Sequence, residues 1–503
     1  MTGKKKLAFA ATGGLLLAVA VVLVALYPYR AQTTIASAAG CNMRTDIVEP
    51  ISGEPQGYVV LFHGLSANKR IMWYIAEGFA AENLRVFVPD LPGHGRTPGP
   101  FTPARAQACA ESFVQQLIDR RAIVPQRTIL AGHSMGGAIA VQTASRIPVA
   151  GAIAISPAPM RPGRGVWREM LLFVNSGPLP PRTLVLSGAW EPSSMRESAA
   201  ALVESNADPT DKYVVLPHTS HVSLIFNPAT LRESRQWSAH LLGVETEAAT
   251  PRLSPLFGAL LGIVALSVLV VPFLHELVAQ PPVGVSSESA SFPKPVHSLF
   301  QVTIVSVLCA ALLKLGVPLR FLNIFEGDYL ASFFLLSGLA LLAWNHKLAA
   351  ANFRFSWRAI LAAAFAAFVL LFLLSGWFDL TFSESSLTVP RWLRFPGMFL
   401  AFLPWHFAEE CFLAPYGSLS RWKRLTLPLV FRAIAWLAMT AALFLLRSGE
   451  ILIVLLSAYF AFFFVLQRLA VDVVHRETRS AAAAAVFGAI LFAGLALAIF
   501  PVA

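Results

Sequence analysis

Long apolar runs constrain this chain more than any other feature of its sequence. One occupies residues 7–27, and eight more follow residue 252. The later runs fall near 253–278, 298–318, 328–344, 357–377, 395–414, 425–446, 450–467 and 481–501. Each has about the length that a helix needs to cross a bilayer. Because 56% of all residues are apolar and the mean hydropathy is +0.62, we expect a membrane protein with nine spans rather than one soluble domain.

The apolar runs divide the chain into three parts. The first run follows Lys4–Lys6 and ends in Tyr27–Arg30, which does not resemble a signal-peptidase site. We therefore expect residues 1–30 to form a cytoplasmic basic end and a retained transmembrane anchor. Residues 31–250 form a polar domain, and residues 251–503 form an all-α polytopic membrane domain of about eight helices.

Charges in the predicted loops orient the chain, because cytoplasmic loops carry an excess of lysine and arginine. Alternate loops hold Lys347, Arg354 and Arg358, then Arg421, Lys423 and Arg424, and finally Arg468, Arg476 and Arg479. The intervening loops hold Glu326, Asp328, Asp379, Glu384 and Glu450, with Arg391 and Arg394 as exceptions. The pattern predicts a multi-pass protein of the plasma (inner) membrane, with a cytoplasmic N-terminus and the polar domain on the extracytoplasmic side.

The polar domain contains a G-x-S-x-G pattern at residues 132–136. An apolar, strand-like run over 128–133 precedes the serine, and a helix-forming run over 138–142 follows it. A serine on such a tight strand-to-helix turn has a strained backbone and an accessible hydroxyl, and the two glycines leave room for the neighbouring strand and helix. Ser134 is therefore the candidate nucleophile.

Two more strand-like runs precede this turn. Residues 57–62 lead into His63-Gly64, and residues 85–89 lead into the Asp90-Leu-Pro-Gly-His-Gly-Arg-Thr segment, with a helical pattern between the two runs. This alternation favours an α/β class with a doubly wound sheet. Together the His-Gly turn, the PDLPGHGRT segment and GHSMGG resemble the α/β-hydrolase fold, in particular monoacylglycerol lipases, lysophospholipases and related esterases. The resemblance covers about residues 50–243.

The resemblance implies a Ser-acid-His order along the chain. Glu191 follows the strand-like run after Arg182, and His221 precedes an Asn-Pro helix start. An imidazole must accept the serine proton, and a carboxylate must fix its tautomer, so Ser134, His221 and Glu191 form the predicted triad. Asp208 and Asp211 remain alternatives for the acid.

The resemblance also implies supporting groups. The oxyanion donors are the backbone N–H groups of Leu65 and Met135. Residues that support the motifs are His63, Gly64, Gly132, His133 and Gly136. His218 is the alternative base, and residues 157–181 form the predicted lid.

The membrane half contains one polar oddity inside an apolar run. His406 lies within one helical turn of Glu409 and Glu410. Ionisable groups at such positions are costly, so they suggest a proton relay, an ion site or a polar joint between helices. The glutamate pair resembles the EExxxR motif of intramembrane CAAX-type proteases, but the arginine of that motif is missing.

Charge and cysteine content limit the cofactors and partners. Residues 28–252 hold 20 Lys/Arg against 17 Asp/Glu, which predicts no nucleic-acid partner. Cys41 and Cys109 fall on the oxidising side and are able to pair, and no metal-type spacing occurs, so we expect no metal or other cofactor. We predict a membrane-anchored serine hydrolase that cleaves lipid or other acyl esters. The alternative is a transport or intramembrane-site protein with an accessory hydrolase-like domain.

Overall fold

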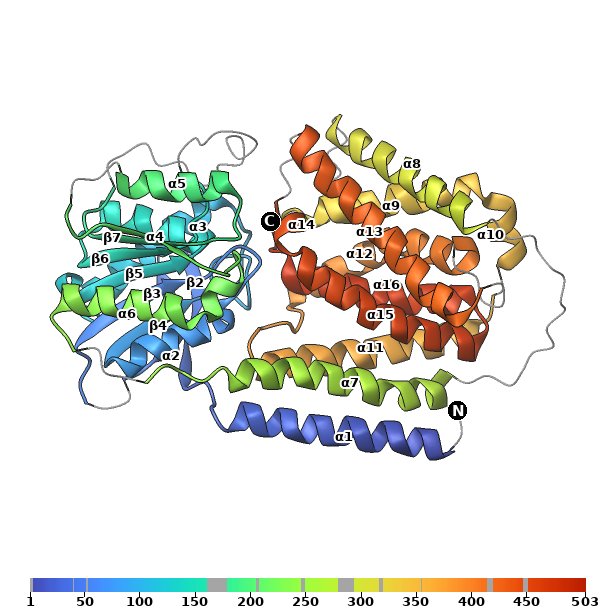
Figure 1. Cartoon of the computed structure of the whole chain (residues 1–503), viewed down its shortest axis with the longest axis horizontal. Coiled ribbons are helices and arrows are strands. Elements are labelled where there is room, and N and C mark those ends of the chain that lie inside the picture. Colours follow the sequence, from blue (N-terminus) through green and yellow to red (C-terminus); the bar gives the residue numbers. More distant parts are fainter. Residues whose placement is uncertain are drawn as a thin grey trace. The chain divides into compact units, whose positions relative to one another are not determined.

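The structure is a computed structural model, and it divides into two compact units that are described separately (Figure 1). It describes residues 3–38, 40–50, 53–160, 179–204, 208–245, 249–278, 294–315, 320–353, 355–413, 419–446 and 451–503. The α/β unit comprises Val24–Leu256, Thr381–Glu384 and Pro501–Ala503. The helical unit comprises Met1–Leu23, Phe257–Leu380 and Ser385–Phe500.

An eight-stranded mixed sheet in the order β1-β2-β4-β3-β5-β6-β7-β8 forms the centre of the α/β unit. The strands are β1 (Ala31–Ala38), β2 (Cys41–Val48), β3 (Gly57–Phe62), β4 (Leu84–Pro89), β5 (Thr128–His133), β6 (Gly151–Ile155), β7 (Thr183–Gly188) and β8 (Lys212–Leu216). Strands β3 to β8 pair in parallel, whereas β2 pairs antiparallel with both β1 and β4. The alternation of motifs did not predict this antiparallel β1–β2 pair.

Helices cover both faces of the sheet. They are α2 (Trp73–Ala81), α3 (Pro103–Asp119), α4 (Met135–Arg146), α5 (Ser193–Glu204) and α6 (Pro228–Leu242), with short 3₁₀ turns η1 (Lys69–Met72), η2 (Pro125–Arg127) and η4 (Ser223–Phe226). In Figure 1, α2 and α6 lie on one face and α3, α4 and α5 on the other. Strands β5, β6 and β7 are therefore buried throughout, and this explains their continuous apolar runs. A disulfide joins Cys41 of β2 to Cys109 of α3.

The parallel register places the carboxyl ends of four strands at one edge of the sheet. Phe62 of β3 pairs with Gly132 of β5, and Ile155 of β6 pairs with Leu186 of β7. The residues that directly follow these strands therefore meet at this edge, which in parallel α/β sheets is where ligands bind.

The helical unit consists of packed helices. They are α1 (Gly3–Ala25), α7 (Ser254–Val278), α8 (Pro295–Lys314), α9 (Gly327–Trp344), α10 (His346–Asn352), α11 (Trp357–Leu380), α12 (Val389–Ala408), the π-helix η5 (Glu409–Leu413), α13 (Arg421–Leu446), α14 (Leu452–Leu455), α15 (Ser457–Thr478) and α16 (Ala481–Ile499). Helix α16 packs against α11, α12 and α15. In the most apolar 18-residue stretch of α16, 78% of the residues are buried, against 11% in the corresponding stretch of α1.

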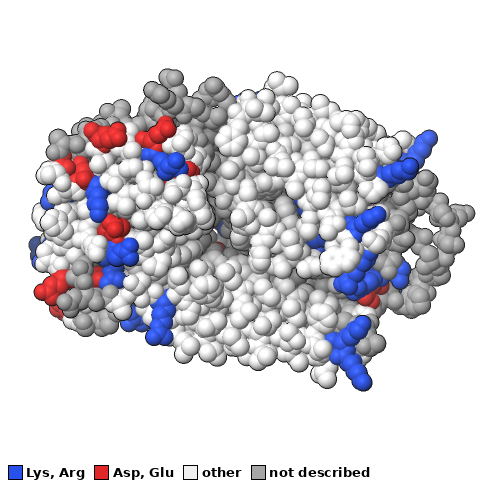
Figure 2. All heavy atoms as spheres, in the orientation of Figure 1, with Lys and Arg blue, Asp and Glu red and all other residues white. Residues whose placement is uncertain are grey.

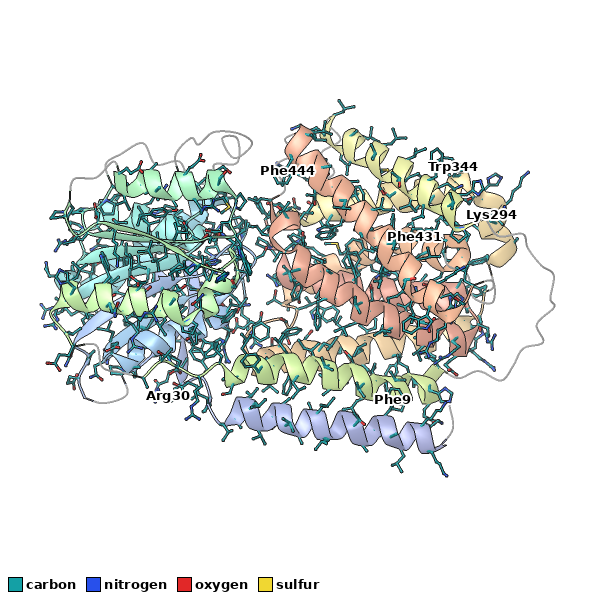
Figure 3. All side chains as sticks on the ribbon, viewed as in Figure 1. Phe9, Arg30, Lys294, Trp344, Phe431 and Phe444 are labelled. Carbon is teal, nitrogen blue, oxygen red and sulfur yellow. A yellow bond between two sulfur atoms is a disulfide. The ribbon has the colours of Figure 1, made fainter. Side chains whose placement is uncertain are left out.

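Eight helices in the described part of the chain are long and apolar enough to cross a membrane: α1, α7, α8, α9, α11, α13, α15 and α16. Helix α12 covers the one remaining expected run, at 395–414, and is not among these eight; it contains Arg391, Arg394 and two internal prolines. Figure 2 shows mostly uncharged atoms over this unit, with Lys and Arg side chains gathered near one end. Along α13, Phe431 is buried whereas Phe444 is 40% exposed (Figure 3).

The structure corrects one predicted span. The run at 450–467 was expected to end before a loop that contains Arg468, but α15 extends from Ser457 to Thr478. Arg468 and Asp472 lie inside this helix and are almost fully buried. Each faces an oppositely charged side chain, and this compensates the cost of burying a charge within a helix.

Candidate active site

Ser134 lies on a strained turn between β5 and α4. Its φ of 54° and ψ of −116° are rare for a residue with a side chain. A Cβ at Gly132 would lie 2.2 Å from the backbone of Gly136, and one at Gly136 would lie 2.2 Å from the carbonyl oxygen of Phe62. Only glycine fits at both positions, because backbone atoms of the turn and of β3 lie against them. The Ser134 N–H donates to the carbonyl of Ile155 over 2.9 Å, which ties the turn to β6.

The structure brings His221 and Glu191 together at the same edge of the sheet. The two atoms His221 Nδ1 and Glu191 Oε1 are 2.8 Å apart, and both residues are buried. The second carboxylate oxygen, Oε2, accepts a hydrogen bond from the N–H of Gly188 over 2.8 Å. Burial disfavours the charged carboxylate, but hydrogen bonds from His221, Ser156 and Gly188 outweigh it, so the pKa of Glu191 lies below its ordinary value.

The histidine of this pair lies beside the serine turn. His133 immediately precedes Ser134, and its ring centroid is 4.9 Å from that of His221. His133 Nε2 is 2.8 Å from the backbone carbonyl oxygen of His221, so His133 donates this hydrogen bond. Burial lowers the pKa of His133 to about 3, which keeps its ring neutral. His133 therefore holds the loop that carries His221.

Ser156 belongs to this arrangement and was not predicted from the sequence. It directly follows β6, and its hydroxyl forms a hydrogen bond with Glu191 Oε1 while lying 2.7 Å from His221 Nδ1. Its φ of 47° turns the chain sharply at the end of the strand. The available signal was its place directly after the buried strand β6, which neighbours β5. The carboxyl ends of parallel strands meet at one edge of the sheet, so a serine there is expected near Ser134.

The alternative acids and the alternative base have other surroundings. Asp208 accepts hydrogen bonds from Thr210, and Asp211 accepts one from the N–H of Thr183 over 2.6 Å. The ring of His218 faces Trp190, at 6.1 Å between ring centroids. The geometry therefore favours Glu191 and His221 for the two roles.

The His-Gly turn after β3 packs directly against the serine turn. A Cβ at Gly64 would lie 2.9 Å from His133 Nδ1 and 3.3 Å from the Cβ of Ser134. His63 is structural: its Nδ1 lies 2.8 Å from the carbonyl of Gly64, and its Nε2 accepts from the N–H of Leu91 over 3.0 Å. Burial lowers the pKa of His63 to about 4, so it stays neutral while it holds this turn.

The two predicted oxyanion donors flank Ser134. Leu65 follows Gly64 in the turn that touches the serine, and Met135 is the first residue of α4. The first N–H groups of a helix have no partner within the helix, so they are available to stabilise developing negative charge. Of the predicted lid, residues 161–178 lie outside the described residues.

In the helical unit, Glu409 and Glu410 belong to the π-helix that follows α12. Arg432 of α13 donates to Glu409 from Nε over 3.0 Å and from Nη2 over 2.7 Å. Glu410 is paired with Arg468 and His475 of α15. The arginines that the local sequence lacked thus come from other helices.

His406 completes the polar cluster of the helical unit, which we define as His406, Glu409, Glu410, Arg432, Gln467, Arg468 and His475. All its members are buried. His406 Nδ1 lies 3.6 Å from Glu409 Oε2, and Arg432 donates to Gln467 over 2.6 Å. Divalent cations bind carboxylate oxygens directly, so glutamates occupied by arginines do not suit them. In the described part of the chain, no group of His, Cys, Asp and Glu is arranged to hold a metal ion.

A mixed sheet with a strained serine turn and an adjacent His-Glu pair defines an α/β-hydrolase domain. In agreement, residues 59–272 match the family model described as the alpha/beta hydrolase family. A stretch of 123 residues is 30% identical to the monoacylglycerol lipase of Mycolicibacterium smegmatis and covers 24% of this chain and 43% of that protein. A stretch of 92 residues is 29% identical to the pimeloyl-(acyl-carrier protein) methyl ester esterase of Nitrosospira multiformis and covers 18% and 34%.

These matches span less than half the length of either relative. Among solved structures, a soluble variant of the monoglyceride lipase from Saccharomyces cerevisiae has a TM-score of 0.34 and 15% identity, over 44% of this chain and 99% of that one. An esterase from Pyrobaculum calidifontis has a TM-score of 0.34 and 17% identity, over 48% and 92%. Scores this low add nothing to the case for a particular activity.

Proposed function

We propose that the α/β unit is a serine hydrolase that cleaves acyl esters through an acyl-enzyme intermediate. The observation that carries the proposal is the buried His221–Glu191 pair, at 2.8 Å, beside the strained turn of Ser134. A carboxylate on Nδ1 leaves Nε2 unprotonated, and an unprotonated Nε2 is the form that can accept a proton from a serine hydroxyl.

Each residue then has one role in the reaction. Ser134 Oγ attacks the ester carbonyl while His221 Nε2 takes its proton, and Glu191 stabilises the imidazolium that forms. The N–H groups of Leu65 and Met135 stabilise the oxyanion. His221 gives the proton to the leaving alcohol. Water then attacks the acyl-enzyme while His221 takes its proton, and the Ser134 oxygen leaves with that proton as the carboxylic acid is released.

For the substrate we propose a membrane-derived lipid ester, such as a monoacylglycerol or a lysophospholipid. Two facts support this choice: one similar protein is a monoacylglycerol lipase, and the apolar helices α1 and α7 directly precede and follow residues 26–253. If both helices enter a bilayer, they confine the domain to the membrane surface and raise its effective concentration toward lipids there. In detergent or liposomes, kcat/KM should rise with acyl chain length, and a flat or falling profile beyond short chains would contradict a lipid substrate.

We propose that the protein crosses the plasma (inner) membrane several times, with a cytoplasmic N-terminus and the α/β unit outside. The eight apolar helices and the Cys41–Cys109 disulfide support this topology, because disulfides persist on the oxidising side. An impermeant thiol reagent on intact cells should label a cysteine placed at Ser193, which is exposed. Labelling only of a cysteine at Ser356 would mean the opposite orientation.

One observation favours a second candidate function, which is transport or another intramembrane activity at the polar cluster of the helical unit. Nε and Nη2 of Arg468 and Nε2 of His406 are buried without a hydrogen-bond partner among the described residues. Unpartnered N–H groups are costly, and a π-helix often marks a functional site. Under this alternative the α/β unit is accessory. Hydrolysis by Glu410→Gln at the wild-type rate would show that the ester chemistry does not need this cluster.

A fluorophosphonate probe tests the proposed nucleophile, because only an activated serine reacts with it at a useful rate. The purified full chain should be labelled, and Ser134→Ala should not. His221→Ala should lose labelling and ester hydrolysis, whereas the matched control His218→Ala should keep most of both. Equal labelling of wild type and Ser134→Ala would contradict the assignment.

A further inference from the structure

Two short segments, distant in sequence from the rest of the α/β unit, belong to it. One is Thr381–Glu384, between α11 and α12, and the other is Pro501–Ala503, after α16. In the second segment, Val502 exchanges backbone hydrogen bonds with Gly93 and Phe101. The unit that carries Ser134 is therefore completed by residues from far along the chain.

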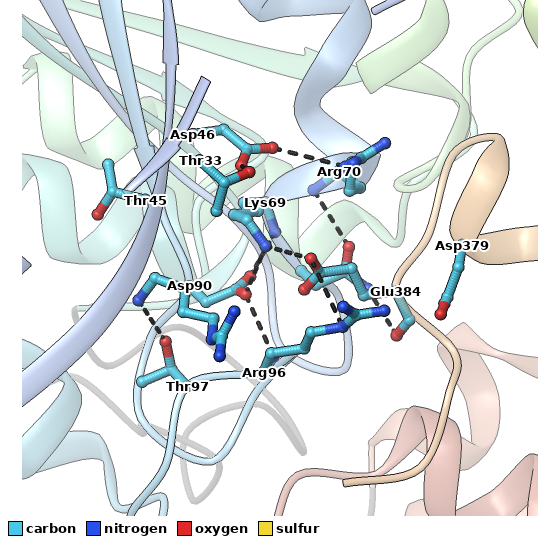
Figure 4. A network of polar contacts seen from close by, with 12 residues as sticks. Thr33, Thr45, Asp46, Lys69, Arg70, Asp90, Arg96, Thr97, Asp379 and Glu384 are labelled. Carbon is cyan, nitrogen blue, oxygen red and sulfur yellow. Dashed lines mark hydrogen bonds and ion pairs between the residues drawn. The ribbon is translucent and has the colours of Figure 1, made fainter. Parts of the chain in front are cut away.

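The first segment ends in a buried ion-pair network (Figure 4). Lys69 is fully buried, and its Nζ lies 3.0 Å from Asp90 Oδ2 and also contacts Glu384 Oε1. The backbone N–H of Lys69 donates to Asp90 Oδ1 over 2.7 Å. A buried ammonium is stable only when it is paired, so the two carboxylates together fix the position of Lys69.

Further contacts seat the same segment. Asn68 Nδ2 donates to Ser383 Oγ over 3.1 Å and to the carbonyl of Glu384 over 3.4 Å. The side chain of Phe382 packs against the apolar core of the α/β unit. Three consecutive residues of the segment thus contact the unit, and two of them do so through Asn68 and Lys69.

The position of Lys69 matters because of the loop it ends. Residues 63–68 connect β3 to η1, which begins at Lys69, and Leu65, one of the two predicted oxyanion donors, lies in this loop. The loop is pinned at its start by Gly64, which packs against Ser134, and at its end by Lys69. Leu65 lies between these two points, and the carbonyl of Gly64, which belongs to the same peptide group as the Leu65 N–H, accepts a hydrogen bond from the N–H of Ala67 over 3.2 Å. A shift of Lys69 therefore reaches the Leu65 N–H through Ala67.

The charges of the network balance only when Glu384 is present. Asp46, Asp90 and Glu384 face Lys69, Arg70 and Arg96, and Arg96 Nε lies 4.0 Å from Glu384 Oε1. Removing the Glu384 charge leaves Asp90 as the ion-pair partner of Lys69, with Asp46 acting from farther away, and weakens the hold on the end of the loop.

We propose that Glu384 is a positioning residue for ester hydrolysis, which acts through Lys69 on the oxyanion loop at residues 63–68. The inference rests on the proposed serine-hydrolase function. Under this role, hydrolytic activity depends on how the segment Thr381–Glu384, between α11 and α12, packs against the rest of the α/β unit. A change in that packing then regulates hydrolysis without touching the triad.

The test compares purified full-length variants in detergent, with a monoacylglycerol as substrate and kcat calculated per site titrated by the fluorophosphonate. Glu384→Gln should lower kcat and the labelling rate at least tenfold, with KM within about twofold, because a misplaced oxyanion donor affects the transition state more than substrate binding. Glu384→Asp should recover most of the activity, since it keeps the charge. Glu233→Gln removes a surface partner of Lys212 and is the matched control, with wild-type kinetics expected.

A purely structural role would lower the yield of titratable protein but leave kcat per site unchanged, and that result would overturn the inference. If Glu384→Gln does not fold, Phe382→Ala decides, because it loosens the same segment without changing the loop or leaving a buried charge unpaired; a kcat equal to wild type would again overturn the inference. If wild type itself neither labels nor hydrolyses esters, the proposed function fails first. If wild type is active and Glu384→Gln has the same kcat, the positioning role is refuted while the proposed function stands.

Discussion

Replacing Glu191 by glutamine tests the geometry of the proposed triad directly. In the structure, Oε2 of Glu191 accepts from the N–H of Gly188, and Oε1 faces both His221 Nδ1 and Ser156 Oγ. The Gly188 donor needs an acceptor, so it directs the carbonyl oxygen of glutamine to the Oε2 position. The amide NH₂ group then faces His221 Nδ1.

This arrangement reverses the histidine tautomer. Facing a donor, Nδ1 must act as an acceptor, which moves the ring proton to Nε2 and prevents Nε2 from accepting the proton of Ser134. In a serine protease triad the same acid-to-amide change lowers kcat about 10⁴-fold. Here Ser156 Oγ lies 2.7 Å from Nδ1 and offers an alternative acceptor, so we expect a loss of about 10³- to 10⁴-fold, or about 4 to 5 kcal/mol in the barrier.

The assay is kcat and KM for ester hydrolysis by the purified full chain, with active sites titrated separately. KM should change little, because the carboxylate acts on the transition state and not on substrate binding. Asp208→Asn is the matched control, since its carboxylate bonds Thr210, and it should behave as wild type. A loss of less than tenfold in Glu191→Gln, with an intact fold, would refute the assignment of the acid.

Three other outcomes follow from the same site and its scaffold. Ser156→Ala should lower kcat about tenfold but retain fluorophosphonate labelling, because one hydrogen bond to a charged group contributes about 1.5 kcal/mol; an unchanged kcat would contradict its role. The pKa of Glu191 is lowered from 4.5, so its ionised form stabilises the fold fully above pH 4.5, and this stabilisation is lost as the pH falls through the lowered pKa. Thermal unfolding should therefore show a smaller acid-induced loss of stability in Glu191→Gln than in wild type. Replacing Cys41 and Cys109 by serine should lower the free energy of unfolding by about 4 kcal/mol, measured by denaturant titration in detergent, because the bond closes a loop of 68 residues; an unchanged midpoint would argue against the disulfide.

Much of the α/β unit was predictable from local sequence. Strand β5, Ser134 and α4 follow one another without interruption, so a strand-to-helix turn with glycines at its crowded positions can be inferred before any fold is known. The apolar runs of the helical unit are equally local signals. Predictions from local runs fail where charge is compensated from elsewhere, as in α15, where Arg468 is buried because Glu410 of another helix faces it.

The sequence by itself determined the apolar helices and the serine turn, because each of these depends on neighbours a few positions away. The order of the candidate triad residues came from the resemblance to the α/β-hydrolase fold. Only the tertiary structure decided that Ser156 joins Glu191 and His221, and that Glu384 pairs with Lys69 across 315 positions of sequence. The physical reason is that a buried polar group must find a partner in space, and the partner is chosen by which strand ends and loops the fold brings to the same place.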